Sequence, residues 1–232
     1  RHRIFGFYND DDYQIVFSDT PGVIIPAYKM QESMMTFVKE ALQDADIFLF
    51  MAEVGDRNFK DERVLEKLQK TETPLIVALN KIDIGDQEAM EADIAYWSEA
   101  FPNAKKVLPL SVIEKFNVRE LFALIRDLIP EGPEWYPKDQ LTDKSERFVV
   151  SEIIRDKILT HFQQEIPYSV QVEVEAFQEE ETIVRIRAVI IVVRDSQKNI
   201  IIGRGGSMIK RVGTDARKDM ERFFDKKVFL ET

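Results

Sequence analysis

The sequence contains no cysteine among its 232 residues. Disulfides and thiolate metal sites are therefore excluded, and we expect a reducing compartment, the cytoplasm. Any apolar run of the roughly 18 residues that a membrane-spanning helix needs is also lacking. Positive charge is in short supply, because the net charge is −10; this argues against a protein that coats nucleic acid over its whole surface and leaves room only for a local basic patch.

What is present, 44% hydrophobic and 32% charged residues, is typical of a globular chain with one large domain or two ordinary ones. The first half alternates strand and helix patterns. Two short runs, Ile4 to Tyr8 and Tyr13 to Ser18, flank an acidic turn and predict a hairpin. Further strands are expected at 46–53, 74–80 and 106–110, and helices at 31–45, 59–71, 87–101 and 118–128. This alternation predicts an α/β domain with a mainly parallel sheet.

The pattern changes between Pro130 and Asp143, where three prolines and a glycine suit a linker. We therefore predict a first domain at 1–129, a linker at 130–144 and a second domain at 145–232. The second domain is expected to be α+β. Its elements should be a long helix at 145–162, strands at 168–177 and 182–193, a glycine-rich turn between helices, a helix at 212–224 and a strand at 228–231, in the order α-β-β-α-α-β.

Polar residues follow three of the strands predicted in the first domain. They are Asp19-Thr20-Pro21-Gly22, Asn80-Lys81-Ile82-Asp83 and Ser111-Val112. In an open parallel sheet, ligands bind beyond the carboxyl ends of the strands, so we expect these residues to share one edge. Each motif alone has an ordinary interpretation: Asp-Thr-Pro-Gly is good turn chemistry, and a lone serine is uninformative. The three together, in this order, favour a bound nucleotide.

The chemistry of these residues fits a guanine nucleotide. Asp83 can accept two hydrogen bonds from the N1–H and the amino group of guanine, whereas adenine has no donor at N1. Lys81 can pack its stem over the base, and Asn80 can tie neighbouring loops together. The backbone of Ser111 and Val112 can meet the base oxygen.

Asp19 and Gly22 suit the phosphate end of the same ligand. Asp19 can hold Mg²⁺ through water, because Mg²⁺ keeps much of its hydration shell. Gly22 has no Cβ, so its N–H can approach a γ-phosphate closely.

A second motif lies in the later half, at Gly203-Arg204-Gly205-Gly206. A GxxG flanked by apolar helical turns is the mark of a KH domain, whose loop clamps single-stranded nucleic acid. From Arg185 to Arg217 there are eight basic and two acidic residues, a net charge of +6, and Lys210 and Arg211 follow the loop directly. The plainer interpretation is a glycine-capped turn between two helices.

These motifs resemble the GTPases and, more narrowly, the Era family. The quoted motifs are joined by the opening Arg1-His2-Arg3-Ile4, by Tyr136-Pro137 and Asp139-Gln140-Leu141-Thr142-Asp143 in the linker, and by Ser151-Glu152-Ile153-Ile154-Arg155. The resemblance implies a monomeric GTPase that uses GTP, GDP and Mg²⁺, binds near the 3′ end of small-subunit rRNA and assists assembly of the small ribosomal subunit. It also implies peripheral association with the inner membrane, which no residue pattern here indicates.

Two departures qualify the resemblance. The phosphate-binding G-x-x-x-x-G-K-[ST] loop is absent, and the family places that loop and the central strand before it ahead of the Arg1 equivalent. The sequence also stops at Leu230-Glu231-Thr232, inside an expected final strand, so we expect the real polypeptide to be longer at both ends. Val23 follows Gly22 where Ras-like enzymes place a water-orienting glutamine; we therefore name no catalytic base and expect slow hydrolysis. Two other functions stay open: a nucleotide-independent KH chaperone whose GTPase domain no longer works, and a tandem GTPase of the Der type.

Overall fold

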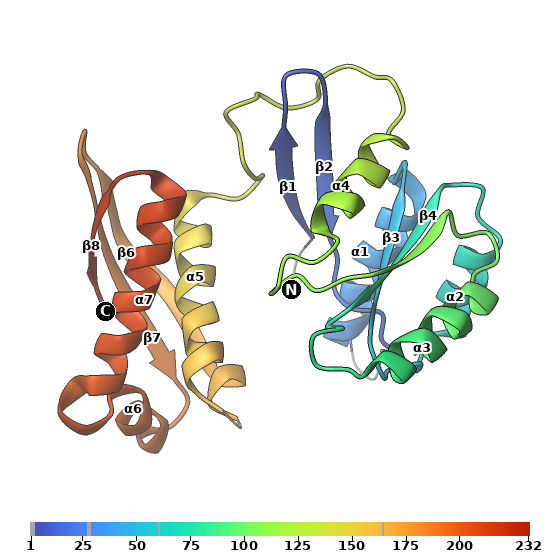
Figure 1. Ribbon diagram of the computed structural model, residues 1–232. Coiled ribbons are helices and arrows are strands. Elements are labelled where there is room, and N and C mark those ends of the chain that lie inside the picture. The colour runs from blue at the N-terminus through green and yellow to red at the C-terminus, as the bar shows by residue number, and fades with distance from the viewer. Residues whose placement is uncertain (1–2, 27–28, 60, 164) are drawn as a thin grey trace. The chain divides into compact units, whose positions relative to one another are not determined.

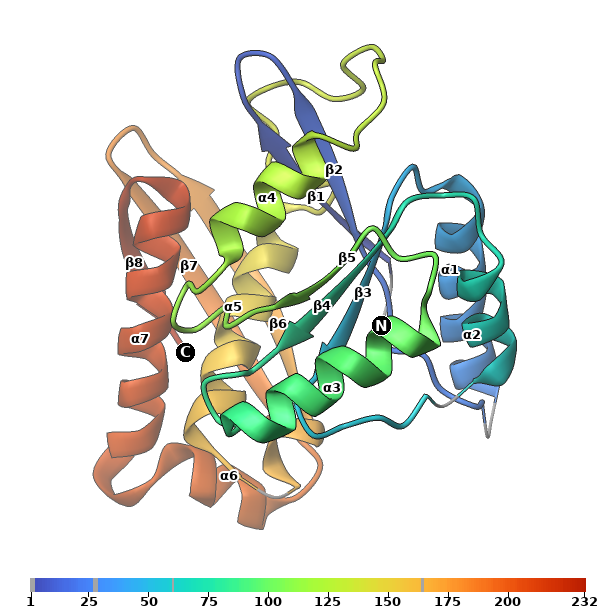
Figure 2. The same ribbon diagram turned by 45° about the vertical axis from the view of Figure 1, so that its right-hand side comes forward.

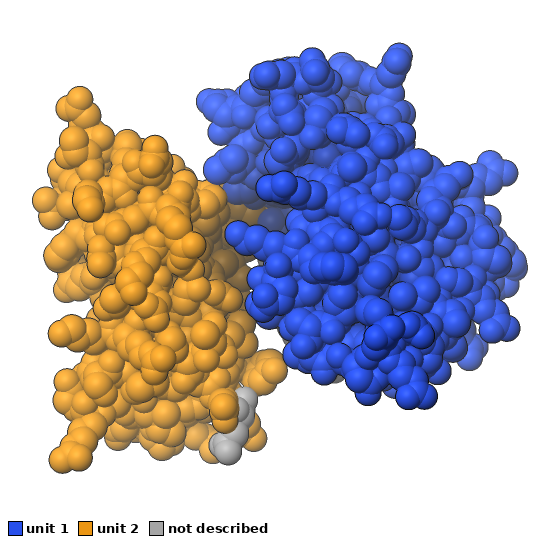
Figure 3. Space-filling model, viewed as in Figure 1, with its two compact units in different colours: residues 1–143 blue, residues 144–232 orange. Residues whose placement is uncertain are grey.

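The computed structural model describes residues 3–26, 29–59, 61–163 and 165–232. It divides into two compact units, residues 1–143 and 144–232, each described here by itself (Figure 3). The segment expected as a linker falls almost wholly within the first unit. Arg1 and His2 of the opening motif lie outside the described residues.

The first unit holds two separate sheets (Figure 1). Strands β1 (Ile4–Asn9) and β2 (Gln14–Asp19) form an antiparallel hairpin. Strands β3 (Phe48–Glu53), β4 (Leu75–Asn80) and β5 (Lys106–Pro109) form a parallel sheet in the order β3-β4-β5. The parallel α/β sheet is as predicted. Among the described residues β2 pairs only with β1, so the three motif-bearing strands are not all hydrogen-bonded into one sheet.

The middle strand β4 carries the core of this unit. Its residues 75–79 are all fully buried, and they alternate between two apolar clusters. Leu75, Val77 and Leu79 face the cluster that includes Trp97 and Phe101. Its even-numbered residues face a second cluster that contains residues of the hairpin and of helix α4 (Val118–Arg126). Alternation with burial on both faces is what a central strand of a parallel sheet requires.

Four helices surround this sheet (Figure 2). They are α1 (Lys29–Asp44), α2 (Glu62–Gln69), α3 (Gln87–Ala100) and α4 (Val118–Arg126). Aspartates begin two of them: Asp61 Oδ1 accepts from the N–H of Arg63 at 3.0 Å, and Asp86 Oδ1 accepts from the N–H of Ala89 at 2.7 Å. Such caps satisfy backbone donors that the first turn of a helix leaves free.

The segment before the second unit is packed along the hairpin. Tyr136 stacks on the buried Phe7, with ring centroids 4.0 Å apart. Gln14 Oε1 accepts from the N–H groups of Trp135 and Tyr136, at 3.0 and 3.1 Å. The N–H of Phe7 donates to the carbonyl of Leu141 at 2.9 Å. This segment is therefore fixed to β1 and β2 and does not behave as a free tether.

The second unit has the predicted order. It contains α5 (Glu146–His161), a short 3₁₀ turn η1 (Ile166–Tyr168), β6 (Val170–Glu179), β7 (Ile183–Val192), α6 (Asp195–Ile202), the turn η2 (Arg204–Gly206), α7 (Ser207–Phe224) and β8 (Lys227–Glu231). The sheet order is β6-β7-β8, with β6 antiparallel and β8 parallel to β7. One core of α5, α7 and sheet residues holds it together. No helix in the described part of the chain is long and apolar enough to cross a membrane.

Candidate nucleotide and RNA sites

The carboxyl ends of β4 and β5 bring two of the predicted motifs together. Leu79 pairs with Pro109 in the parallel register, and the N–H of Leu110 donates to the carbonyl of Leu79 at 2.8 Å. The N–H of Ile82, two residues after the end of β4, donates to the carbonyl of the same Leu110 at 3.3 Å. The loop after β4 therefore lies against the loop after β5.

Side chains complete this contact. The hydroxyl of Ser111, which is 1% exposed, donates to Asp83 Oδ1 at 2.5 Å and accepts from the N–H of Glu114 at 3.2 Å. A carboxylate oxygen has two acceptor positions, so this bond still leaves Asp83 able to receive two guanine donors. We predicted only a backbone role for Ser111. Its hydroxyl in fact contacts and orients Asp83, and no local sequence pattern indicated this role.

Asn80 ties the two loops together, as we predicted for it. Its Oδ1 accepts from the N–H of Val112 at 3.3 Å. The backbone N–H of Val112, which we expected to meet the base oxygen, donates here to Asn80. The carbonyl of Asn80 in turn accepts from the N–H of Val54 at 3.0 Å, which adds the end of β3 to the site.

Lys81 bridges the ends of β3 and β4. Its backbone is in the left-handed region, with φ +64°, and its Nζ lies 2.7 Å from Glu53 Oε2. Both side chains are about half exposed. The ion pair holds the lysine at the carboxyl ends of β3 and β4. That its stem packs over the base stays a prediction.

Asp19 and Gly22 come from the other sheet, at and after the end of β2. Asp19 ends β2, is exposed, and its carboxylate makes no hydrogen bond or ion pair with the residues that the structure describes. A Cβ built on Gly22 would meet no atom within 4 Å, so its backbone is open to a ligand. No group of three or more potential metal-ligating residues occurs among the described residues. One free carboxylate beside an open glycine fits a water-bound Mg²⁺ that has a phosphate as a further ligand.

Arg3 anchors the hairpin to α1. Its guanidinium donates to both carboxylate oxygens of Asp44, at 2.8 and 2.9 Å, and its Nε donates to the hydroxyl of Ser18 at 2.6 Å. The hydrogen bond from Arg3 lowers the pKa of Asp44 below its ordinary value of 3.8, although burial partly opposes it. The start of β1 is thereby attached to the end of α1.

The glycine loop of the second unit turns the chain between α6 and α7. Gly203, Gly205 and Gly206 all have positive φ, at +70°, +62° and +76°. A Cβ on Gly203 would lie 2.6 Å from Met208 Cγ, whereas Cβ atoms on the other two would meet nothing within 4 Å. Gly203 is therefore required for packing. Gly205 and Gly206 leave their backbone open, as a phosphate-binding loop needs.

Ion pairs divide the basic residues of this unit into two groups. The arginines on the outer face of β7 and in the middle of α7 are neutralised: Arg185 by Glu180, Arg187 by Glu175 and Arg217 by Glu221. Within residues 185–217, five exposed basic residues have no ion pair with any described residue: Arg194, Lys198, Arg204, Lys210 and Arg211. In this stretch the unpaired positive charge therefore lies on α6, the glycine loop and the start of α7; elsewhere in the unit Arg147 and Lys227 are also exposed without an ion pair to the described residues. We call these five residues the loop cations.

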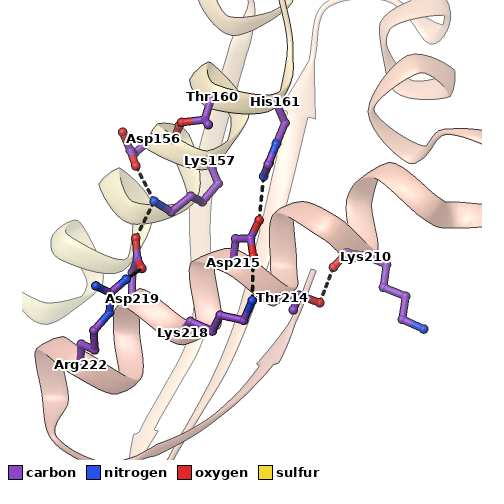
Figure 4. A network of polar contacts seen from close by, with 10 residues as sticks. All are labelled: Asp156, Lys157, Thr160, His161, Lys210, Thr214, Asp215, Lys218, Asp219 and Arg222. Carbon is purple, nitrogen blue, oxygen red and sulfur yellow. Dashed lines mark hydrogen bonds and ion pairs between the residues drawn. The ribbon is translucent and has the colours of Figure 1, made fainter. Parts of the chain in front are cut away.

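A polar network joins α5 to α7 (Figure 4). His161 Nε2 lies 3.0 Å from Asp215 Oδ2, and Lys157 Nζ lies 2.5 Å from Asp219 Oδ2. Hydrogen bonds from Lys218 and His161 lower the pKa of Asp215. The Lys210 side chain points away from this network, which leaves it available to a ligand.

Comparisons with known proteins agree with this geometry. Residues 1–81 match the family model of the 50S ribosome-binding GTPase, and residues 165–232 match that of the KH domain. GTPase Era from Staphylococcus epidermidis and from Geotalea daltonii are each 40% identical over 233 residues, which cover 100% of this chain and 78% of the relative.

Solved structures show the same similarity. A crystal structure of Era in complex with MgGDPNP and nucleotides 1506–1542 of 16S ribosomal RNA has a TM-score of 0.83 and 31% identity, covering 100% of this chain and 80% of that one. A structure of an Aquifex aeolicus Era variant bound to GDP.AlF4⁻ has a TM-score of 0.84 at the same identity and coverage.

Proposed function

The chain belongs to the Era family of GTPases, and from that premise we propose that it is a GTP-regulated protein that binds near the 3′ end of small-subunit rRNA and assists small-subunit assembly. The observation that carries the proposal is the pairing of two sites in one chain. Asp83, held by Ser111, is set to select guanine, and the glycine loop with its loop cations is set to hold a single strand. The solved relative holds both kinds of ligand together.

Guanine selection follows from the geometry around Asp83. A second carboxylate oxygen and a free lone pair on the first can accept the two donors on the guanine edge. An adenine base would leave the carboxylate unpaired, which costs about 1–3 kcal/mol. Asp19 would hold Mg²⁺ through water, and the bound ion would neutralise charge on the phosphates.

Hydrolysis receives little help from the described residues. Val23, in the place of the water-orienting glutamine of Ras-like enzymes, is half-buried and packs against the core cluster of Trp97 and Phe101. An apolar side chain there cannot orient water.

The hairpin offers a route from nucleotide to RNA. Asp19 pairs with Ile4 across the hairpin. The next residue, Phe5, exchanges hydrogen bonds with Asp143, the last residue of the first unit: its N–H donates to Asp143 Oδ1 at 2.9 Å, and its carbonyl accepts from the N–H of Asp143 at 3.4 Å. Asp19, which would hold Mg²⁺, is therefore connected through Ile4 and its neighbour Phe5 to Asp143, the last residue before the second unit. Nucleotide-dependent movement of Asp19 would shift that segment.

The nucleotide-independent chaperone is the weaker alternative. A carboxylate oriented by a buried serine has no use without a guanine ligand. A tandem GTPase of the Der type would carry a second set of nucleotide motifs, and the sequence has one.

The test uses the full-length protein and its Asp83→Asn variant. The side-chain amide of asparagine places an N–H donor opposite the amino group of guanine, which is also a donor. Xanthine has a carbonyl at that position, which can accept from the amide. We expect the variant to bind GTP at least about tenfold more weakly and to prefer xanthosine triphosphate. RNA from the 3′ end of the small-subunit rRNA, and a permuted RNA of the same composition, are titrated in parallel. Unchanged GTP affinity of the variant would contradict guanine selection by Asp83. Equal affinity for both RNAs would contradict specific binding to the 3′ end of the small-subunit rRNA.

A further inference from the structure

Tyr168 is exposed to an unusual degree for an aromatic residue. Its exposed fraction of 86% is the highest among the large hydrophobic side chains of the described residues. It lies in η1, between α5 and β6, where the two preceding residues, Ile166 and Pro167, are buried in the core. Its ring makes no ring–ring or cation–π contact with any described residue. The backbone of the turn is therefore anchored while the ring is presented to solvent.

Hydrogen bonds attach this turn to α6. The hydroxyl of Ser169 accepts from Gln197 Nε2 at 2.9 Å and donates to the carbonyl of Glu165 at 3.0 Å. The Oε1 of Gln197 accepts from the N–H of Arg194 at 3.0 Å. Gln197 thus links the residue after Tyr168 to the start of α6.

Tyr168 therefore lies at the end of α6 that carries Arg194 and Lys198. Both are loop cations, exposed and without an ion pair in the described ranges. The opposite end of α6 is Gly203, the first residue of the glycine loop, and α6 lies at the lower end of the second unit in Figure 1. An eight-residue helix is about 12 Å long. The exposed ring of Tyr168 thus lies at one end of the short helix α6 and the glycine loop at the other, and Arg194 and Lys198 lie between them.

From this arrangement we propose that Tyr168 stacks on an RNA base beyond the nucleotides that the glycine loop clamps, and that Arg194 and Lys198 hold the intervening phosphates. The inference rests on the proposed RNA-binding function and extends it along α6. A KH loop clamps four nucleotides, so the stacked base would belong to a longer strand. Every base has a π-face, so the contact adds affinity with little choice of sequence. The phenol hydroxyl is not needed for stacking.

The experiment compares two RNAs on the full-length protein by fluorescence anisotropy. One is a four-nucleotide RNA that fills the clamp alone, and the other is a strand of about ten nucleotides that contains it. We expect Tyr168→Ala to weaken binding of the longer RNA by about 5- to 150-fold and to leave the short one unchanged. Tyr168→Phe should bind both as the parent does, and Tyr168→Leu, which keeps an apolar side chain without the ring, should behave as the alanine variant.

The outcomes separate this inference from the function that it extends. Parental affinity of Tyr168→Ala for the longer RNA, or an equal loss on both lengths, would overturn the stacking role. Loss in the Tyr168→Phe variant would also overturn it, because the ring is retained. Gly205→Asp serves as the reference: if it binds both RNAs as the parent does, the clamp itself is wrong. Circular dichroism of each variant checks that the KH unit is folded.

Discussion

Replacing Gly205 by aspartate should weaken RNA binding by roughly a hundredfold without unfolding the KH unit. Gly205 has φ +62° and ψ +26°, in the left-handed region, where a residue with a Cβ costs about 1–2 kcal/mol and aspartate less. A Cβ there meets no atom within 4 Å, so no steric cost is added. The folded unit should therefore lose about 1 kcal/mol of stability or less.

The effect on RNA should be larger. The new side chain intrudes where a phosphate must approach the backbone, and its carboxylate faces like charge, which costs several kcal/mol. About 3 kcal/mol corresponds to roughly a hundredfold loss of affinity. Gly205→Asn is the matched control: it has the same shape and tolerance of left-handed backbone but no charge. It should lose less affinity, and the difference between the two variants should shrink at high salt.

Gly203 provides the opposite control within the same loop. A Cβ at Gly203 would approach Met208 Cγ to 2.6 Å and the Met208 backbone nitrogen to 3.0 Å. Gly203→Ala should therefore lower the melting temperature of the KH unit, because backbone must shift. Anisotropy titrations with single-stranded rRNA and thermal melts measure both effects. If folded Gly205→Asp binds RNA as tightly as the parent, the loop is a structural turn and the reasoning is refuted.

Three further results are expected. Ser111→Ala should weaken GTP binding by about 1 kcal/mol, because it removes a hydrogen bond to the guanine-site carboxylate; equal GTP affinity by calorimetry would contradict this. The pKa of Asp44 is lower in the folded than in the unfolded protein, so its pairing with Arg3 stabilises the fold above about pH 4. This contribution disappears as the pH falls through the folded pKa. Urea unfolding should therefore show a smaller loss of stability between pH 7 and pH 3 for Asp44→Asn than for the parent. Tyr136→Ala should leave RNA affinity nearly unchanged but reduce the difference in RNA affinity between the GTP-bound and GDP-bound states. An unchanged difference in titrations would contradict the proposal that the β1–β2 hairpin connects nucleotide to RNA.

The elements with strong local patterns could be predicted from the sequence. The continuous apolar run at 75–79 indicated a strand buried on both faces, and the structure buries it fully. The helix–strand order of the KH unit was also predicted, since its amphipathic and alternating segments are long. The start of α7 was predicted five residues late, at Val212, because its first turn at Ser207 follows directly on the glycine loop.

Features that depend on tertiary neighbours could not be predicted in this way. The hydroxyl of Ser111 acts on a carboxylate 28 residues earlier, and no local pattern encodes that distance. The packing of Tyr136 on Phe7 joins opposite ends of the first unit. The net charge of +6 at 185–217 counted Arg185, Arg187 and Arg217, which strand and helix neighbours neutralise.

The central claim is that nucleotide and RNA binding are coupled in one chain. Full-length protein is titrated with single-stranded RNA from the 3′ end of the small-subunit rRNA in the presence of Mg·GDPNP and, separately, of GDP. We predict tighter RNA binding with GDPNP, and by linkage the same factor must appear in the affinity for GDPNP when RNA is added. The same RNA affinity in both nucleotide states would contradict the claim.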